Sequence, residues 1–262
     1  MKIQVLMENT TERTDIISEH GLSFYVETEK HKLLFDMGQT DGFAENAARM
    51  GVDLSQVDIA ILSHGHYDHG GGLGRFLELN KKAHVYMSRY AMEPHFSGER
   101  YIGLNTDLVG NERFVLAGDV LKIDDELCLY SCNMRDRSYA ADSFGLKMRR
   151  KEMLVPDDFR HEQYLLIQEG TKRVLLSGCS HKGILNIMEW FNPDVLIGGF
   201  HFMKLDAEGE GKAVLKNAAD ILNRYHTQYY TCHCTGRQQF EYLKRIMGEK
   251  VEYLSAGMEI WV

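Results

Sequence analysis

The sequence predicts an α/β protein whose strands and helices form a layered sandwich. In each half of the chain the first expected strands follow one another through short turns, as antiparallel strands do. Strands then alternate with helices, which is typical of parallel strands joined by crossover helices. This order of elements occurs twice along the chain. Together these observations favour a sandwich of layers over a doubly wound sheet.

The first half is expected to begin with short strands and to continue with alternating helices and strands. Each expected strand is an apolar or β-branched run bounded by polar or glycine-containing turns, and each helix is a longer segment with apolar residues at helical spacing. The expected strands are 2–7, 21–27, 32–36, 57–62 and 83–87, and the expected helices are 42–50 and 72–79.

The remaining sequence again contains short strands followed by alternating helices and strands. Strands are expected at 113–117, 120–123, 126–131, 163–168, 172–177, 194–198, 228–231 and near the C-terminus, and helices at 182–191, 211–225 and 236–247. No regular element is expected in 88–112 or in 133–161. Because long loops beside a site commonly carry specificity, these two segments are candidates for the wall of a substrate pocket.

A weak internal repeat relates the two halves. Lys32–Gly38 is a strand with a small turn, and a helix and a strand ending at His64 follow it. Arg173–Cys179, a helix and a strand ending near His201 repeat that order. A pseudo-two-fold arrangement would bring the turns of both halves to one seam, where a site could form.

Length and composition set further limits. The 262 residues suffice for one domain over 1–262, with halves of about 1–125 and 126–262. The net charge of -8 argues against a nucleic-acid-binding surface. No apolar run approaches the ~18 residues of a membrane span, and Met1–Met7 is expected to be a strand rather than an export signal. The five cysteines are not spaced as a disulfide framework, so we expect a reducing, cytoplasmic setting.

The most informative segment is Ser63–Gly72, which follows the apolar run 57–62 directly. It holds three histidines and one aspartate within six residues: His64, His66, Asp68 and His69. An apolar strand that ends in such a cluster delivers several metal ligands to one point at the edge of a sheet. Imidazole and carboxylate ligands suit zinc, with iron or manganese as alternatives. The competing interpretation is a polar turn with accidental histidines, which the density of the cluster disfavours.

Several motifs resemble those of the metallo-β-lactamase superfamily. The cluster, continued by Gly71-Gly72-Leu73, resembles its signature, and Leu34–Gly38 is similar to its first motif, in which the aspartate, here Asp36, supports the site from behind. Five more motifs resemble a branch of hydrolase-like proteins labelled as related to dihydropterin-ribofuranosyl-aminobenzene-phosphate synthase. They are Glu19–Ser23, Phe159–Gln163, Gly178–His181, Gly198–His201 and His233–Gly236.

The resemblance implies a four-layer αβ/βα sandwich, the metallo-β-lactamase fold, with a dinuclear metal site at the seam. His64 and His66 would bind one metal, and Asp68 and His69 would bind the other. Geometry agrees with this division, because residues two apart at a strand end point to the same side. The following turn then carries Asp68 and His69 to a second ion a few ångströms away.

Each metal needs further ligands, and we expect His181 to complete the first site and His233 the second. The superfamily has a bridging aspartate where this sequence has Cys179. A thiolate can bind zinc, so Cys179 is either a ligand or a small core residue. Without a bridging carboxylate, one of the two sites could be weak or partly occupied. The other cysteines, among them Cys232 and Cys234, are expected to be core residues.

The other histidines are given lesser roles. His201 is expected to enter the pocket as a proton donor or substrate contact, with a structural role as the alternative. His20 and His161 are candidates for pocket residues or for supports of the ligands, and His95 lies on an expected pocket loop. The remaining histidines are expected at the surface or in packing: His31, His84 and His226.

These features predict a metal-dependent hydrolase in which a metal-bound hydroxide attacks an ester, lactone, amide or phosphodiester of a small molecule. Asp68 would orient the nucleophile and hold the second ion, and His201 would assist the leaving group or the oxyanion. The basic patch Lys147–Lys151 could recognise a phosphate or another anion, although such a run is more often a solvated face.

Three alternatives stay open at this point. The first is the pterin-linked synthase of the branch label, which forms a bond to a phosphorylated ribose. The second is a di-iron redox protein; such proteins usually carry an attached flavin domain, for which this chain is expected to have no room. The third is a binding module that keeps a metal site but has lost turnover, which Cys179 makes conceivable.

Overall fold

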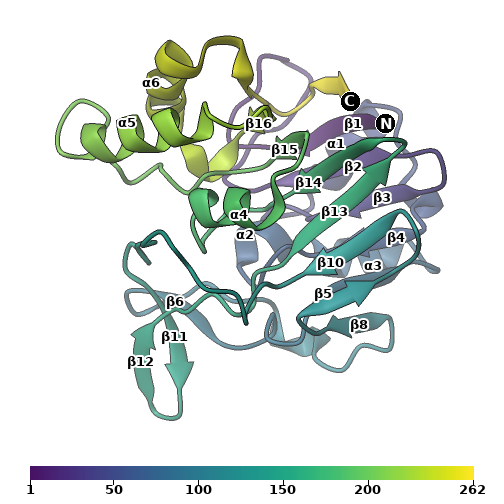
Figure 1. Ribbon diagram of the computed structural model, residues 1–262. Coiled ribbons are helices and arrows are strands. Elements are labelled where there is room, and N and C mark those ends of the chain that lie inside the picture. Colours follow the sequence, from purple (N-terminus) through teal and green to yellow (C-terminus); the bar gives the residue numbers. More distant parts are fainter.

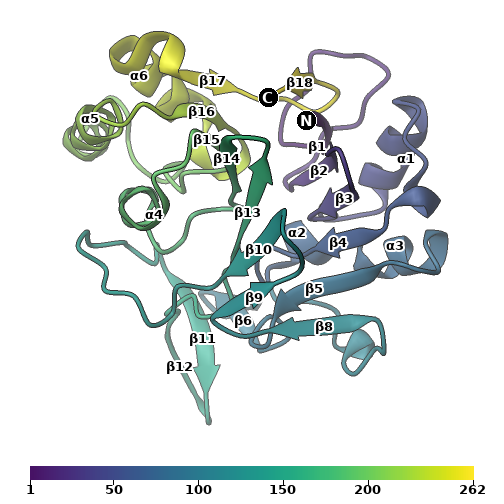
Figure 2. The same cartoon turned by 45° about the vertical axis from the view of Figure 1, so that its right-hand side comes forward.

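Two seven-stranded sheets pack face to face in the computed structural model, which describes residues 1–262 (Figure 1). Helices α1 (Gly42–Arg49) and α3 (Leu73–Leu79) cover the outer face of one sheet, and α4 (Ile184–Phe191), α5 (Gly211–Leu222) and α6 (Arg237–Met247) cover the other (Figure 2). This arrangement confirms the predicted four-layer αβ/βα sandwich. Within the chain, no helix has both the length and the apolar character that a membrane crossing would require.

The first sheet belongs mainly to the N-terminal half. Its strands are β1 (Lys2–Met7), β2 (Ser23–Glu27), β3 (Lys32–Phe35), β4 (Ile59–Ile61), β5 (His84–Ser88), β8 (Phe114–Ala117) and β18 (Glu259–Trp261), in the order β18-β1-β2-β3-β4-β5-β8. Strands β1 to β3 pair antiparallel, whereas β3, β4, β5 and β8 pair parallel. The last strand returns to pair with the first, so both termini lie side by side (Figure 1).

The second sheet repeats this plan. Its strands are β9 (Val120–Lys122), β10 (Leu127–Tyr130), β13 (Tyr164–Glu169), β14 (Lys172–Leu176), β15 (Val195–Ile197), β16 (Gln228–Thr231) and β17 (Val251–Tyr253). Strands β9, β10, β13 and β14 pair antiparallel, and β14 to β17 pair parallel. The predicted sequence of antiparallel strands followed by β–α alternation is therefore present in both halves.

The two segments expected to be irregular contain a third sheet, so that expectation was wrong. Its strands are β6 (His95–Ser97), β7 (Arg100–Tyr101), β11 (Leu146–Arg150) and β12 (Met153–Pro156), and β6 pairs with β11. The strands are short, and the charged residues of β11 obscure the alternation that marks a strand in a sequence. The β11–β12 hairpin projects from the body of the molecule (Figure 1).

Three hydrophobic cores fill the spaces between the four layers. The central core receives Leu33 and Phe35 from β3 and Val174 and Leu176 from β14, whereas the residue between each pair points to the helices on the outer side. Successive side chains of a strand face opposite sides, so a strand covered on both faces must be apolar throughout. This explains why the central strands read as unbroken apolar runs.

Leu176→Ala should lower the free energy of unfolding by about 2–5 kcal/mol, because it leaves a cavity in the fully buried central core. Leu116→Ala is the matched control, since this leucine of β8 is 56% exposed, and it should change stability by less than about 0.5 kcal/mol. Urea denaturation of both variants in the presence of a chelator measures the difference without metal binding. Equal stability of the two variants would contradict the layer assignment.

Candidate metal centre

The histidine cluster lies where parallel strands of both sheets end. His64 follows β4 in the first sheet, whereas Cys179 and His181 follow β14 and His233 follows β16 in the second. The carboxyl ends of parallel strands are where α/β sheets commonly bind ligands. Residues from both halves therefore meet at the seam between the sheets, as the internal repeat predicts.

Gly178 permits this close approach of the two halves. A Cβ atom built on Gly178 would lie 2.2 Å from Ser63 Oγ and 3.1 Å from His64 Nδ1. Both atoms are buried and held by hydrogen bonds, so neither can move aside cheaply. Glycine at this position is a condition for bringing the turn after β14 against the histidine cluster.

Two pairs of imidazole nitrogens face each other at the seam. His64 Nε2 lies 3.2 Å from His181 Nε2, and His69 Nε2 lies 3.2 Å from His233 Nε2. The ring of His66 packs edgewise against those of His64 and His181. All five histidines are buried.

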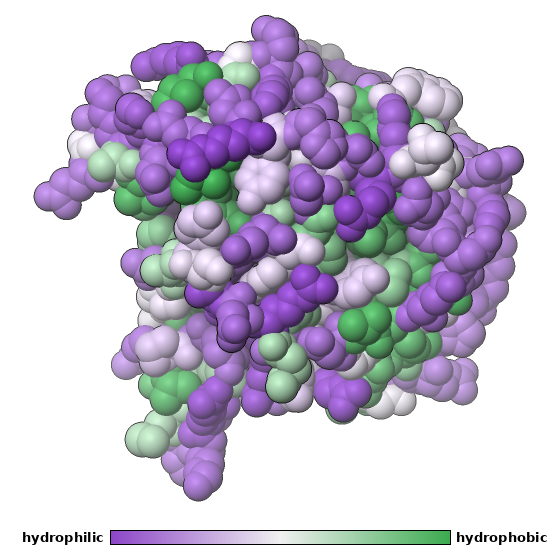
Figure 3. All heavy atoms as spheres, in the orientation of Figure 1, coloured by the Kyte–Doolittle hydropathy of each residue, from purple (hydrophilic) through white to green (hydrophobic).

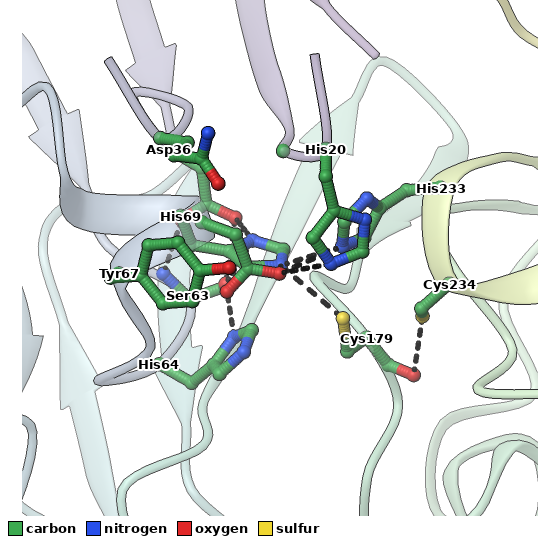
Figure 4. Close-up of polar contacts among 12 residues, drawn as sticks. His20, Asp36, Ser63, His64, Tyr67, His69, Cys179, His233 and Cys234 are labelled. Atoms are coloured by element: carbon green, nitrogen blue, oxygen red, sulfur yellow. Dashed lines mark hydrogen bonds and ion pairs between the residues drawn. The ribbon is translucent and has the colours of Figure 1, made fainter. Parts of the chain in front are cut away.

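A carboxylate joins the second pair. Asp68 Oδ2 lies 3.3 Å from His233 Nε2 and 3.9 Å from His69 Nε2, and the half-exposed His20 brings its Nε2 to 3.2 Å from the same oxygen. Figure 4 shows the rings of His20 and His233 next to each other and His69 between them and Asp36. The sequence left the role of His20 open, and the structure places it at the second pair.

Asp36 selects the tautomer of one histidine in each pair. It accepts a hydrogen bond from His69 Nδ1 at 2.6 Å and another from Ser63 Oγ at 2.7 Å. Since Ser63 gives its proton to Asp36, its oxygen accepts the proton of His64 Nδ1 at 2.8 Å. The Nε2 atoms of His64 and His69 therefore carry lone pairs that point into the seam.

Asn9 selects the tautomer of His233, the partner of His69. Its Oδ1 atom accepts the proton of His233 Nδ1 at 2.7 Å, so His233 Nε2 also carries a lone pair. Two lone pairs 3.2 Å apart repel each other unless a cation lies between them. Two nitrogen ligands about 2.0–2.1 Å from a tetrahedral zinc lie about 3.3 Å apart. The donor set thus fits a bound divalent cation.

Cys179 belongs to both groups of donors. Its Sγ atom lies within 4.8 Å of the ligand atoms of His64 and His181, and equally of those of His69 and His233. The distance from Sγ to His69 Nε2 is 3.2 Å (Figure 4). Cys179 thus stands between the two pairs, in a position from which one sulfur could contact two metal ions.

The electrostatic environment prepares the donors for a metal. Burial and the neighbouring imidazoles hold the pKa values of His64, His66 and His181 well below the ordinary value, so these rings are neutral. Burial disfavours the Asp68 carboxylate, but the histidines around it outweigh burial and hold its pKa well below the usual range. Burial raises the pKa of the Cys179 thiol, so a thiolate there needs a cation beside it.

His201 lies at the border of the centre. Its ring packs edgewise on His181 with 4.2 Å between the ring centroids, and its backbone has a φ of 58°, which is rare for a residue with a side chain. Its Nε2 atom has no hydrogen-bond partner. His201 lines both the 200 Å³ cavity that contains the donors and a larger neighbouring cavity, as predicted for a pocket residue.

Comparisons with known proteins agree with this fold. A model of the metallo-β-lactamase superfamily matches residues 18–106. The crystal structure of a metal-dependent hydrolase of the β-lactamase superfamily superimposes with a TM-score of 0.83 and 30% identity over 100% of this chain and 99% of that chain. The chain belongs to the metallo-β-lactamase superfamily.

Two curated proteins of Methanocaldococcus jannaschii are also similar to this superfamily member. One, of uncharacterised function, is 27% identical over 89% of this chain and 90% of its own length. The other is named 7,8-dihydropterin-6-methyl-4-(β-D-ribofuranosyl)-aminobenzene-5'-phosphate synthase, and it is 29% identical over 92% of this chain and 89% of its own length. Both likenesses extend over nearly the whole superfamily fold.

Two buried glutamates support the centre and were missed in the sequence. Glu162 accepts the backbone N–H of His181 at 2.7 Å and the Tyr164 hydroxyl at 2.6 Å. Glu8 accepts the N–H of His233 at 2.7 Å and the Tyr253 hydroxyl at 2.7 Å. Two turns of the second half, after β14 and after β16, are thus held by the same device. Glu162 lies within the motif Phe159–Gln163, but no residue beside either glutamate along the chain signals this role.

A second histidine cluster supports His66. His95 donates from Nδ1 to Asp157 at 2.8 Å, and His161 Nδ1 accepts the N–H of Gly65 at 3.0 Å. His161 thus carries its proton on Nε2, which leaves no lone pair there for a metal. Burial and His95 lower the pKa of His161 to about 4. His161 is therefore placed to support the cluster rather than to bind a metal, and His95, expected on a pocket loop, is buried on β6.

The basic patch Lys147–Lys151 does not reach the centre. It lies on the β11–β12 hairpin, where Arg149 packs over Phe96 and Arg150 pairs with Asp158. None of its residues lines the two cavities at the seam. The expected surface histidines behave as predicted: His84 is exposed, and His31 and His226 pair with surface carboxylates.

Glu162→Gln and Glu8→Gln should each weaken metal binding about 10- to 100-fold, because each removes a charged acceptor that holds the loop of a ligand. Glu241→Gln is the control, since this glutamate is exposed on α6. Competition with a chromophoric chelator measures the affinity, and circular dichroism verifies the fold. Unchanged affinity in both buried variants would exclude this role.

Proposed function

We propose that the protein is a metal-dependent hydrolase that binds two divalent cations, with zinc as the first candidate. The observation that carries the proposal is the two pairs of facing imidazole nitrogens at the seam, each 3.2 Å apart and each joining the two halves of the chain. The first cation would be held by His64, His66 and His181, and the second by Asp68, His69 and His233. Cys179 would be a ligand shared between them.

The bound cations would supply Lewis-acid chemistry, lowering the pKa of water and stabilising negative charge on the substrate. The protein's own residues would orient the attacking water and transfer a proton. Asp68 lies at the mouth of the centre, where its carboxylate would hold the second cation and orient the attacking water. His201 has a free ring nitrogen beside the donors, so it is placed to give a proton to a leaving group.

The charges around the centre favour an anionic substrate. Arg100 and Lys204 line the 200 Å³ cavity that contains the donors, and Asp68 is its only acidic residue. Two bound divalent cations would outweigh the negative charges of Asp68 and of a Cys179 thiolate, so the loaded cavity would be positive. A phosphate ester or phosphodiester would be attracted more strongly than a neutral ester or lactone. We therefore assign recognition of the anion to Arg100 and Lys204, and not to the patch Lys147–Lys151 that the sequence suggested.

A second candidate function is the synthase reaction named for the 29% identical relative. It shares the phosphorylated small-molecule substrate but forms a bond instead of breaking one with water. Incubation of the zinc-loaded protein with phosphodiesters in ¹⁸O-labelled water separates the two. Label in the product identifies hydrolysis, whereas a zinc-loaded protein that turns over no phosphodiester contradicts the hydrolase and favours the synthase.

His66→Ala should remove at least one metal equivalent and lower kcat/KM for a phosphodiester by about 10³-fold or more, because a ligand of the first cation is lost. His84→Ala is the control, since His84 is exposed at the start of β5. Elemental analysis and initial-rate measurements give both quantities. Full activity together with full metal content in His66→Ala would rule out the assignment.

A shared Cys179 ligand has a spectroscopic consequence. The cobalt(II)-substituted protein should show a thiolate-to-cobalt charge-transfer band in the near ultraviolet, and Cys179→Ala should abolish it. Cys128→Ala is the matched control, because Cys128 lies on β10 away from the centre. If the band is absent from the parent protein, or survives in Cys179→Ala, Cys179 is a core thiol and not a ligand.

A further inference from the structure

A large cavity lies directly beside the metal centre, on the side of α4 and α5. Its volume is about 770 Å³, within the range of small-molecule sites. His181 and His201 line this cavity and the 200 Å³ cavity of the donors, so they form the border between the two. In Figure 3 the outline is indented between α5 and the β11–β12 hairpin, and hydrophobic side chains lie along the indentation.

The wall of the large cavity is aromatic from the metal centre outwards. Phe159 stacks on His181 with 4.5 Å between centroids and an interplanar angle of 7°, and Phe144 packs edgewise on His201 at 5.4 Å. Tyr139, Phe200 and Phe202 continue the wall. Aromatic walls favour flat rings, because stacked and edge-to-face contacts add to the burial of apolar area.

The wall is held in place without a ligand. The side chain of Asn186 on α4 bonds both the N–H and the carbonyl of Tyr139, each at 2.8 Å. Lys204 donates from Nζ to the carbonyl of Phe144 at 2.6 Å. Because hydrogen bonds hold the loop at both aromatic residues, ligand binding would not cost the entropy of ordering the loop.

The charges of the large cavity show which part of a substrate it suits. The charged side chains that line it are Arg137, Asp142 and Asp157, so it has no excess of positive charge. Asp157 is already engaged with His95. An anionic group therefore belongs in the small cavity with Arg100 and Lys204, and an uncharged ring belongs in the large one.

We infer that the substrate is an aryl-bearing anion, whose aromatic ring system occupies the 770 Å³ cavity while its phosphate-type group lies at the metal centre. This inference rests on the proposed function, which places the reacting anion in the 200 Å³ cavity that contains the donors. It adds that the specificity of the enzyme lies in the loop carrying Tyr139 and Phe144 and in the exposed face of α5.

Binding of two phosphonates to the zinc-loaded protein tests the inference without turnover, because a C–P bond resists hydrolysis. 1-Naphthylphosphonate should bind at least about tenfold more tightly than methylphosphonate, since only the former places a ring in the cavity. Val214→Trp inserts an indole from α5 and Ala141→Trp inserts one from the loop that carries Tyr139 and Phe144, and neither residue lines the small cavity. Each should reduce the preference for the naphthyl compound by about fivefold or more and leave the affinity for methylphosphonate unchanged.

Val120→Trp is the matched control. Val120 is 57% exposed on β9 and Val214 is 51% exposed on α5, so both variants add the same surface side chain, but only Val214 lines the cavity. Isothermal titration calorimetry gives the affinities, and thermal unfolding verifies the fold. Equal binding of the two phosphonates, or a preference that survives both cavity variants, overturns the aryl assignment alone. If neither phosphonate binds, the proposed anion-binding centre fails as well.

Discussion

Hydrogen bonds from buried carboxylates to the loops of the centre are the constraint on which the rest depends. Asp36 holds the turn after β4, Glu162 holds the turn after β14, and Glu8 holds the turn after β16. A buried carboxylate is costly unless it is fully hydrogen-bonded, and each of these satisfies that need with backbone N–H groups or hydroxyls. In return, the loops hold imidazole nitrogens 3.2 Å apart, and the facing lone pairs of His69 and His233 would repel each other without a cation between them.

The centre is nevertheless pseudo-symmetric in its donors. Each sheet ends its parallel strands at the seam and each half supplies a share of the donors, whereas both Glu–Tyr pairs support turns of the second half. Cys179 is the feature that breaks the symmetry, because it alone belongs to both donor groups. A shared thiolate would carry one negative charge on a soft atom, which favours zinc or iron over magnesium or calcium. The aromatic cavity then extends only to the side of the second half, so the two halves share the candidate donors, whereas the second half alone supplies the aromatic wall.

Much of the fold and part of the centre could be predicted from local patterns. Apolar runs such as 57–62 are buried on both faces, and the cluster after them could be recognised because its spacing is local. The third sheet could not be predicted, because the pairing of β6 with β11 joins segments about fifty residues apart with weak alternation. Glu8 and Glu162 escaped for the same reason: their partners lie on other loops, and nothing in their neighbourhood along the chain distinguishes them from surface glutamates.

The sequence by itself determined the superfamily, the order of the layers and the identity of the first four candidate ligands, because these depend on contacts between near neighbours and on strand periodicity. Only the tertiary structure decided how His64 meets His181, where Cys179 stands between the pairs, and that Arg100 and Lys204 rather than Lys147–Lys151 surround the centre. Those arrangements are set by the packing of two sheets whose strands are far apart in the chain. Distance and tautomer are properties of that packing, and no local pattern of residues contains them.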